Sequence, residues 1–536
     1  MAKQRIQHIF MLTREYDGLA GAGGIKDFSR QLAEALVRRG FRVSVLLPFY
    51  GFIEPSRFSF KETASAFEVD MSYVGRFRRE SVATWSTELN GVNVYLADAD
   101  RYREKLGVYA YTDEDRGDEP HNQSGMPHFD YFAMNVLLQK AAIAMIIRMG
   151  DKPEIIHCQD GHTAILPAMI REIGGYRHYF EKTGCVVTIH NAGRGYHQEI
   201  GDLAFAETIT GLPSRIILDN QLDGKFDPLL AASSYSLMNT VSENYARELR
   251  ETDDDAQTGW LGHKLLGRGV VLEGVTNGIN PDDYDPSAPE KLGLAAAFSP
   301  LKKSFTGKSR CRAALVKELG AGAMETVKQT GFLYSRPSLP LLTFVGRLTP
   351  QKGVDKMISA LEALLPIDRK FQVLIQGSGA PEIENKLLEL AEDKRYRGRV
   401  CFLCGYDQDL ATRIFAAGDF FLLPSRYEPC GLTDFIAQLF GNLPIVHHIG
   451  GLVKVIDGKT GFAYQAHSSA SLMAAILRAF ELYRRSPEQI AVMRQAAVRH
   501  LHARYTWDIV VERYLKLYLR ALEIARHFQV GPPPDK

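Results

Sequence analysis

Short apolar runs alternate with amphipathic stretches along this chain. Apolar runs at residues 7–12 and 42–47 predict strands. The stretch between them has apolar side chains at helical spacing: Ile25, Phe28, Leu32, Ala35 and Leu36. Gly40 is a typical stop for such a helix. The segment is therefore a strand–helix–strand unit, the building block of a parallel sheet.

The alternation starts again in the second half of the chain. Further strands are predicted at residues 341–345, 371–375, 400–403, 420–423 and 445–446. Helices are expected between them, the first over residues 354–365. Earlier in the chain, a predicted strand at 270–275 ends in the turn residues 277–281, which mark a domain boundary. We therefore expect an α/β protein with two Rossmann-like domains that face one another across a cleft.

Composition and charge narrow the class of protein. A chain of 536 residues exceeds what one hydrophobic core usually serves, and 45% hydrophobic with 24% charged residues is typical of globular proteins. The net charge of +1 gives no bulk attraction to nucleic acid or to an anionic membrane. No apolar stretch is expected to span a membrane, and the apolar core of the N-terminus, residues 9–12, is too short for a signal peptide. Six cysteines are too few for a disulfide framework in so long a chain, which favours the cytoplasm.

The most informative stretch is residues 420–432, FFLLPSRYEPCGL. It predicts a buried strand, a tight turn and a helix with apolar side chains at Leu432, Phe435, Ile436 and Leu439. In an open α/β sheet, ligands gather beyond the carboxyl ends of the strands. The side chains of Arg426, Glu428 and Cys430 are therefore expected to face a cleft.

The helix after this turn begins where an anion could bind. Its first amide groups, those of Gly431, Leu432 and Thr433, are suited to a phosphate. A carboxylate, that of Glu428, beside such a site suggests chemistry on a phosphorylated, polyhydroxylated substrate. The alternative is that Glu428 is only a turn residue that caps the helix.

A second loop with charged residues follows the strand at 341–345. It contains Arg347 and Lys352, which suit a diphosphate because arginine can bind phosphate through two N–H groups and lysine adds a point charge. The alternative for both residues is a surface salt bridge. Tyr406, which follows the strand at 400–403, could stack on a nucleotide base.

The first strand is followed by a loop with four glycines: Gly18, Gly21, Gly23 and Gly24. Their spacing is not G-x-G-x-x-G, so the fingerprint of a nicotinamide or flavin site is not met. Glycines here would instead let the backbone come close to a phosphate or a sugar.

Two polar clusters follow further predicted strands of the first half. Residues 157–162 are HCQDGH, and residues 190–193 are HNAG. For His157 and His162 a structural role is favoured over metal binding, because no helical pair or third ligand is evident. A functional role is favoured for His190, because it lies in a loop after a strand.

Other patterns that could bind a metal are weak, and no metal is expected. The triplet Asp-Ala-Asp at 98–100 has no other support, so a solvated turn is favoured. The CxxC at 401–404 lies in a strand pattern without a second pair. The acidic, apolar-poor segment 107–127 is most simply a surface loop, which could order over the cleft.

Seven stretches together resemble the family of bacterial glycogen synthases and plant starch synthases. They are HCQDGHTA (157–164), TIHNAG (188–193), TVSENYARE (240–248), VTNGIN (275–280), GRLTPQKG (346–353), LPSRYEPCGLT (423–433) and IGGL (449–452). The resemblance covers nearly the whole chain, down to YTWDIVVERYLKLY (505–518), which is similar to the final helices of the family.

The resemblance implies a GT-B fold. Its domains would be residues 1–272 on the acceptor side and 280–503 on the nucleotide-sugar side, with helices in 504–536 that cross back to the first domain. It implies transfer of glucose from ADP-glucose, or less often UDP-glucose, to the non-reducing end of an α-1,4-glucan with retention of configuration. No metal and no cofactor are implied, and the partners would be the donor and the glucan, with neither nucleic acid nor membrane.

The resemblance also implies roles for single residues. Arg347 and Lys352 would neutralise the departing diphosphate, and Glu428 would bind the donor glucose. His190 would lie near the reacting carbon, and Asp160 would hold the sugar or the acceptor. The residues implied to bind the nucleotide sugar are Gly23, Gly24, Asn277, Tyr406, Cys430, Gly431, Leu432 and Thr433.

The residues implied to bind the nucleotide sugar are expected to contact different parts of it. Cys430 and the amide groups of the next two residues would lie beside the sugar and the phosphate. Tyr406 and Thr433 would contact the nucleotide, and Asn277 would lie at the hinge region of the cleft.

The chain departs from the family pattern in the first glycine loop. Family members usually carry a lysine two places before the paired glycines, and that position here is Gly21. Since this lysine contacts the donor phosphates in the family, Lys26 or a residue of 107–127 would supply the charge here, or the donor is handled differently. A second departure, AGRGYHQ at 192–198, adds Arg194 near the sugar.

Two other interpretations stay open. One is a related GT-B transferase with a small sugar acceptor, which activity on small acceptors and none on glycogen would favour. The other is a catalytically weak glucan-binding or priming protein, suggested by the missing lysine. The presence of Arg347, Lys352 and Glu428 together argues against the latter.

Overall fold

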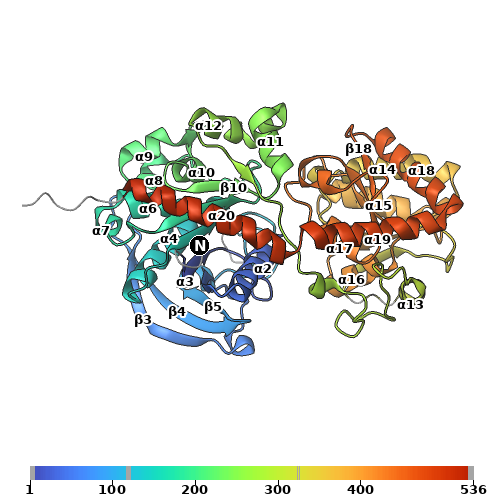
Figure 1. The fold of residues 1–536 in the computed structure, drawn as a ribbon, viewed down its shortest axis with the longest axis horizontal. Helices are drawn as coiled ribbons and strands as arrows, with labels where there is room; N and C mark the ends of the chain where they lie inside the picture. Colours follow the sequence, from blue (N-terminus) through green and yellow to red (C-terminus); the bar gives the residue numbers. More distant parts are fainter. Residues whose placement is uncertain (1–5, 116–121, 323, 325, 529–536) are drawn as a thin grey trace, which may run out of the picture. The chain divides into compact units, whose positions relative to one another are not determined.

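The computed structural model describes residues 6–115, 122–322, 324 and 326–528. The chain forms two compact units (Figure 1). Unit 1 comprises Met1–Gly278 and Trp507–Lys536, and unit 2 comprises Ile279–Thr506. Each unit contains a large sheet whose strands alternate along the chain with helices, as the sequence pattern predicts.

The large sheet of unit 1 is mixed. Its strands are β1 (His8–Leu12), β2 (Arg42–Pro48), β3 (Lys61–Asp70), β4 (Arg79–Leu89), β5 (Val92–Asp98), β6 (Ile155–Gln159), β7 (Gly184–Ile189), β10 (Leu237–Thr240) and β11 (Glu273–Gly274). Their order is β11-β10-β7-β6-β1-β2-β5-β4-β3. Pairs from β11 to β5 are parallel, and β5-β4-β3 is an antiparallel edge. A separate hairpin joins β8 (Gln221–Leu222) to β9 (Lys225–Phe226).

Helices connect these strands. They are α2 (Ile25–Arg38), α3 (Asp100–Arg103), α4 (Tyr131–Arg148), α5 (Asp160–Thr163), α6 (Leu166–Glu172), α7 (Gly174–Arg177), α8 (Leu203–Thr210), α9 (Ser214–Asp219), α10 (Pro228–Ala232), α11 (Glu243–Glu251), α12 (Leu261–Gly267) and α20 (Trp507–Ala525). The helix expected after the first glycine loop is α2, and it ends two residues before Gly40.

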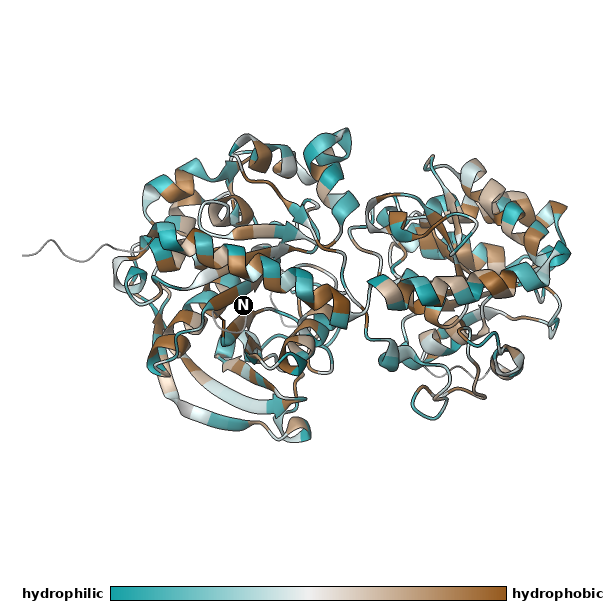
Figure 2. Ribbon diagram, viewed as in Figure 1, coloured by the Kyte–Doolittle hydropathy of each residue, from teal (hydrophilic) through white to brown (hydrophobic). Residues whose placement is uncertain are grey.

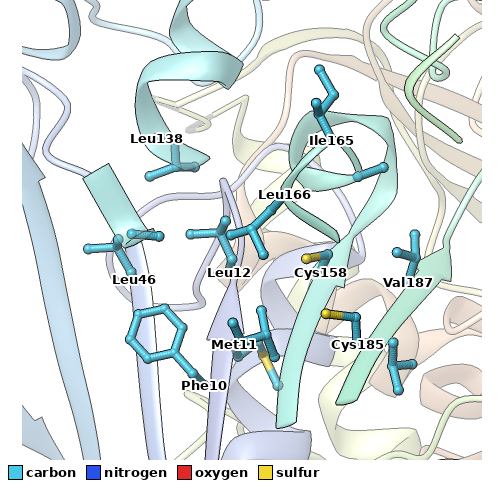
Figure 3. Packing of buried hydrophobic residues seen from close by; sticks show 14 of the residues in the cluster. Phe10, Met11, Leu12, Leu46, Leu138, Cys158, Ile165, Leu166, Cys185 and Val187 are labelled. Carbon is cyan, nitrogen blue, oxygen red and sulfur yellow. The ribbon is translucent and has the colours of Figure 1, made fainter. Parts of the chain in front are cut away.

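The core of unit 1 gathers around its central strands. In Figure 3, Leu12 of β1 lies beside Leu46 of β2 and Leu166 of α6, and Cys158 of β6 lies near Cys185 of β7. All five side chains of β1 are buried, so both faces of this strand are covered. This is why the strand has a continuous apolar run and no alternation with polar residues.

One helix corrects the expectation that no stretch approaches a membrane span. By length and composition, α4 is long and apolar enough to cross a membrane. However, 78% of that stretch is buried inside the structure. Such burial is typical of a core helix, and it explains why this helix is apolar on nearly every face.

The last helix packs on unit 1, although it follows unit 2 in the sequence (Figure 1). Trp507 Nε1 donates a hydrogen bond to Gln31 Oε1 at 2.8 Å, and Ala521 packs against Gly184 of β7. Brown and teal segments alternate along α20 in Figure 2, as expected for a helix with one face buried.

Unit 2 has a seven-stranded sheet. Its strands are β12 (Lys328–Gly331), β13 (Leu341–Val345), β14 (Gln372–Gly377), β15 (Val400–Cys404), β16 (Phe420–Leu423), β17 (Leu443–His447) and β18 (Phe462–Tyr464). Their order is β12-β15-β14-β13-β16-β17-β18, and only β12 is antiparallel to its neighbour.

The helices of unit 2 lie between these strands and after them. They are α13 (Thr306–Ala321), α14 (Val354–Ile367), α15 (Pro381–Glu392), α16 (Gln408–Ala417), α17 (Thr433–Leu439), α18 (Ser469–Arg485) and α19 (Pro487–Arg504). Short 3₁₀ turns include η4 (Pro350–Lys352) and η6 (Gly450–Lys454).

The strand predicted at 270–275 is much shorter than expected. Only β11, Glu273–Gly274, is formed there, because it pairs with β10 alone at the edge of the sheet. An edge strand with one partner has fewer ladder hydrogen bonds to extend it, and the apolar pattern does not show this.

Candidate functional site

Glu428 lies on the turn between β16 and α17. It is 8% exposed, and its Oε2 accepts hydrogen bonds from Lys352 Nζ at 2.6 Å and from Ser425 Oγ at 2.9 Å. Burial alone raises the pKa of this carboxyl, but Lys352 and the Ser425 hydroxyl outweigh burial and hold the pKa below its usual value. Glu428 is therefore an ionised acceptor beside a fixed cation. Among the described residues, no side chain caps α17, whose N-cap residue is Leu432.

The loop after β13 brings both predicted cations to the same edge of the sheet. The backbone N–H of Arg426 donates to the carbonyl of Gln351 at 2.8 Å, which ties this loop to the turn after β16. Because β13 and β16 pair in parallel, their carboxyl ends lie side by side. Arg347 is exposed, and no hydrogen bond or ion pair joins its guanidinium to another described residue. The Lys352 side chain is 22% exposed.

The other predicted residues of unit 2 lie at this edge or close to it in sequence. Cys430 is buried, and Gly431 has a φ of +75°. Leu432 and Thr433 are partly buried at the start of α17. Tyr406 follows β15 and is 63% exposed.

In unit 1, Asp160 and His190 follow the neighbouring strands β6 and β7. Asp160 Oδ1 accepts the backbone N–H of His190 at 2.5 Å and that of Asn191 at 3.4 Å. Burial raises the pKa of Asp160 to about 8, although these two N–H groups oppose the shift. The φ of Asp160 is +53°, a strained value for a residue with a side chain, and such strain concentrates at functional sites.

His190 is an uncharged group. Burial lowers its pKa to about 3. Its Nε2 lies 2.8 Å from Gln159 Oε1. Its ring and the Phe28 ring are in a T-shaped arrangement, with centroids 4.6 Å apart. Because an amide oxygen only accepts hydrogen bonds, Nε2 carries the proton and Nδ1 is left as an acceptor.

The first glycine loop is shaped by a carboxylate that the sequence analysis did not single out. Glu15 Oε2 accepts the backbone N–H groups of Ala22 at 2.7 Å and Gly23 at 2.9 Å. The amide of Gly23 is therefore directed to Glu15 in this structure. Gly23 and Gly24 are both exposed, so a ligand can approach their backbone.

Lys26 occupies the space beside Gly21. A Cβ at position 21 would lie 2.3 Å from Lys26 Cδ. The Lys26 ammonium lies 3.1 Å from Asp17 Oδ1. The chain therefore places a lysine side chain next to the position where the family usually has one.

The stem of segment 107–127 is more than a surface loop. Tyr109 OH donates to Glu15 Oε1 at 2.6 Å, and its ring stacks on His162 with centroids 4.9 Å apart. The segment thus contacts His162 of the cluster at 157–162, and it is linked to the glycine loop through Glu15. Residues 116–121 of this segment lie outside the described residues.

His157 has a structural role, as favoured from the sequence. It is fully buried, with Nδ1 3.0 Å from Tyr518 OH and Nε2 2.7 Å from Thr188 Oγ1. Asp98, of the Asp-Ala-Asp triplet, accepts from Trp85 Nε1 at 2.8 Å. Within the described part of the chain, no group of three or more His, Cys, Asp or Glu side chains could hold a metal ion.

Asn277 lies next to the last residue of unit 1 before the chain enters unit 2. It is 3% exposed, and its Oδ1 has no hydrogen-bond partner among the described residues. Gly278 packs directly against the Trp507 side chain.

The two clusters differ in what they can bind. In unit 2, an ionised carboxylate lies beside Lys352, with Arg347 on the same loop, which suits a hydroxylated group that carries phosphate. In unit 1, His190 is neutral and Asp160 is protonated below about pH 8, which suits uncharged hydroxyl groups.

Four residues were not singled out from the sequence: Glu15 and Tyr109 of unit 1, and Asp434 and Lys454 of unit 2, a buried pair with Oδ1 and Nζ 3.1 Å apart. Glu15 could have been found, because it follows a predicted strand at the carboxyl edge of the sheet. The other three carry no local signal, since their importance depends on contacts with distant parts of the chain.

Comparisons with known proteins give a consistent result. A family model described as "Starch synthase catalytic domain" matches residues 8–265, and one described as "Glycosyl transferases group 1" matches residues 333–497. The chain is 30% identical over 538 residues to the glycogen synthase of Aeromonas hydrophila subsp. hydrophila, covering 97% of this chain and 99% of that protein. It is 28% identical over 522 residues to the glycogen synthase of Lactobacillus acidophilus, covering 92% of this chain and 96% of that protein.

A solved structure shares the fold. It is the catalytic domain of starch synthase IV from Arabidopsis thaliana bound to ADP and acarbose, with a TM-score of 0.80 and 24% sequence identity. The match covers 97% of this chain and 99% of that one.

Proposed function

Because this chain belongs to the family of bacterial glycogen synthases and plant starch synthases, we propose that it transfers glucose from ADP-glucose to the non-reducing end of an α-1,4-glucan with retention of configuration. The chain is a glycosyltransferase, and the GT-B fold expected from the resemblance is confirmed. The observation that carries the finer proposal is the Glu428–Lys352 pair at the carboxyl end of β16.

The choice of ADP-glucose is supported by two features. The starch synthase of similar fold was solved with ADP and acarbose, a nucleotide and a saccharide. In unit 2, Tyr406 is 63% exposed and can stack on a base, and Thr433 lies on the same edge. UDP-glucose is the competing donor.

We assign the diphosphate to the cations of unit 2. Arg347 is exposed and can bind phosphate through two N–H groups, while Lys352 supplies a point charge. When the bond between glucose and phosphate breaks, negative charge develops on the nucleotide. Cations already in place stabilise that charge without reorganisation, and one well-placed donor is worth on the order of a hundredfold in rate.

Glu428 is assigned to the donor glucose. It is ionised, so it accepts hydrogen bonds from sugar hydroxyl groups, and Lys352 holds it in one orientation. Cys430 and the amide groups of Gly431 and Leu432 lie on the same turn, and we assign them to the sugar and the phosphate beside it.

The residues of unit 1 are assigned to the sugars. His190 is neutral and offers Nδ1 as an acceptor near the reacting carbon. Asp160 orients the backbone of that loop and holds the sugar or the acceptor. The exposed backbone of Gly23 and Gly24 comes close to the donor, and Asn277 supports the hinge region.

We place the reaction in the cytoplasm. The six cysteines all lie among the described residues and none forms a disulfide, as expected of a chain that folds under reducing conditions. Neither a metal nor a cofactor is needed in this proposal, because the cations of the leaving-group site are side chains.

The test is incorporation of labelled glucose into glycogen from ADP-glucose and, separately, from UDP-glucose. We expect strong preference for ADP-glucose and loss of activity in Glu428→Ala. The matched control is Glu362→Ala, which removes an exposed carboxylate from α14 of the same unit. If neither donor labels glycogen, the glucan synthase proposal fails, and transfer to a small sugar acceptor becomes the better account.

A further inference from the structure

A buried lysine lies beneath the turn that carries Glu428. Lys454 ends η6, and its side chain is only 4% exposed. Its Nζ donates to the backbone carbonyl of Cys430, to that of Gly431 at 2.7 Å and to that of Gly451 at 3.0 Å. A buried ammonium is costly unless it is surrounded by acceptors, and here backbone carbonyls supply them.

The charge of Lys454 is balanced inside the protein. Asp434, in the first turn of α17, has a fully buried side chain, and its Oδ1 lies 3.1 Å from Lys454 Nζ. The ammonium also lies 4.4 Å from the centroid of the Phe435 ring, a cation–π contact. The pair is therefore enclosed on the α17 side, and solvent does not screen it.

Lys454 controls the direction of two peptide groups. In a trans peptide, the C=O of one residue and the N–H of the next point in opposite directions, and the described residues contain no cis peptide bond. Because the carbonyls of Cys430 and Gly431 point at Lys454, the N–H groups of Gly431 and Leu432 point to the opposite side of the turn.

The paired glycines before Lys454 allow this approach. A Cβ at Gly450 would lie 2.0 Å from the carbonyl oxygen of Glu428, and one at Gly451 would lie 2.0 Å from that of Cys430. The N–H of Gly451 donates to the Glu428 carbonyl at 2.8 Å. Side chains at either position would push η6 away and withdraw the ammonium from the turn.

We propose that Lys454 is a positioning residue for the donor. It holds the carbonyls of Cys430 and Gly431 and thereby fixes the amide groups of Gly431 and Leu432 in the direction in which they bind the diphosphate. This inference rests on the proposed function, because it takes that turn as the donor site.

The test is a double variant, Lys454→Met with Asp434→Asn, which removes both buried charges and nearly keeps their shapes. ADP affinity, measured by titration calorimetry, is expected to fall about tenfold or more, the size of one lost charge-assisted hydrogen bond. The KM for ADP-glucose should rise in parallel, while the KM for glycogen stays within about twofold of the wild-type value. A purely structural lysine would not separate the two KM values.

The matched control is Lys308→Met. Lys308, on α13, is also buried, and its Nζ also donates to three backbone carbonyls: Phe415 at 3.3 Å, Ala416 at 2.9 Å and Phe440 at 2.9 Å. These carbonyls lie away from the donor turn. We expect a comparable fall in Tm and an ADP affinity within about twofold of the wild-type value.

Asp434→Asn alone keeps Lys454 and its carbonyl acceptors. We expect its ADP affinity to stay within about threefold of the wild-type value. If the double variant does not fold, Gly451→Ala decides the matter: its Cβ withdraws the Lys454 ammonium from the turn, so ADP affinity should fall, and an unchanged affinity overturns the role of Lys454. A tenfold loss in Asp434→Asn, or unchanged ADP affinity in a folded double variant, overturns the role of Lys454. If the wild-type protein itself binds neither ADP nor UDP, the proposed function fails, and this inference fails with it.

Discussion

The two units orient their candidate loops with buried charges of opposite sign. In unit 2, the ammonium of Lys454 attracts backbone carbonyls, which leaves amide groups on the other side of the turn. In unit 1, the carboxylate of Glu15 attracts the amides of Ala22 and Gly23, which leaves carbonyls on the other side of the loop. Outward amides suit an anion, whereas outward carbonyls suit hydroxyl groups. The sign of one buried charge thus decides which ligand a glycine-containing turn can bind.

The buried carboxyl groups of the two units show the same contrast. Glu428 has Lys352 at 2.6 Å, and its pKa is held below the usual value. Asp160 accepts two backbone N–H groups, no cation of the described residues lies at hydrogen-bond distance, and burial raises its pKa to about 8. A partner cation, more than burial itself, decides whether such a carboxyl is ionised near neutral pH.

The largest expected effect comes from removing Lys352 of the Glu428–Lys352 pair in unit 2. In Lys352→Met, we expect kcat to fall about a hundredfold or more, because both the proposed leaving-group cation and the partner of Glu428 are lost. The measurement is labelled-glucose incorporation at saturating donor. The control is Lys356→Met, four residues along the chain, where the lysine pairs with Asp355 on the surface of α14. Near wild-type activity in Lys352→Met would show that unit 2 does not depend on this cation.

Removing the Glu15 carboxylate of unit 1 should mainly lower the free energy of unfolding. In Glu15→Ala, the N–H groups of Ala22 and Gly23 lose their acceptor, and the expected loss is roughly 2 kcal/mol or more in the free energy of unfolding. Hydrogen exchange of peptides covering residues 18–24 should become faster. The control is Glu104→Ala. It removes a carboxylate that is 61% exposed and that pairs with Lys105. Unchanged exchange in residues 18–24 would mean that Glu15 does not hold the loop.

A lysine exchange sharpens the comparison further. If Lys26 supplies the charge that the family usually carries at position 21, Lys26→Met should raise the KM for ADP-glucose about fivefold, the scale of one partly exposed charge contact. The rescue is made in Lys26→Ala, which lacks the Cδ that lies 2.3 Å from a Cβ at position 21: adding Gly21→Lys to it should restore the KM. No change in KM for Lys26→Met would assign the cations of the donor site to unit 2 alone.

The smallest expected effect is on the pH dependence of stability, to which Asp160 contributes. Its pKa is about 8 in the folded protein, above the usual carboxyl value near 3.8. The folded state therefore binds more protons than the unfolded state between these values, and this group loses its contribution to stability as pH rises from about 4 to about 8. At pH 5 the buried carboxyl is neutral, like asparagine.

The matching measurement is the Tm of Asp160→Asn minus that of the wild-type protein, at pH 5 and at pH 8.5. The difference should become more positive at the higher pH, by a few degrees. Subtracting the wild-type value removes the effect of other titrating groups that are distant from Asp160. A difference that is independent of pH would show that Asp160 is ionised throughout.

The sequence located most of the strands, because their signal is local. The runs at 341–345 and 420–423 coincide with β13 and β16, since a buried strand needs only consecutive apolar side chains. The strand at 270–275 was overestimated, because its length depends on the number of partners in the sheet. The loop at 107–127 was judged from its polarity, which gave no sign that Tyr109 contacts Glu15 and His162.

The sequence by itself determined the order of elements, the family and the turns on which chemistry could occur. These depend on short motifs and on periodicity, which are properties of neighbouring residues. The tertiary structure alone decided which charges meet. Lys352 and Glu428 are 76 positions apart, and Tyr109 and Glu15 are 94 apart. Only the folded chain brings such residues within hydrogen-bond distance, and that proximity sets the ionisation of Glu428 and the direction of the amides held by Glu15 and Lys454.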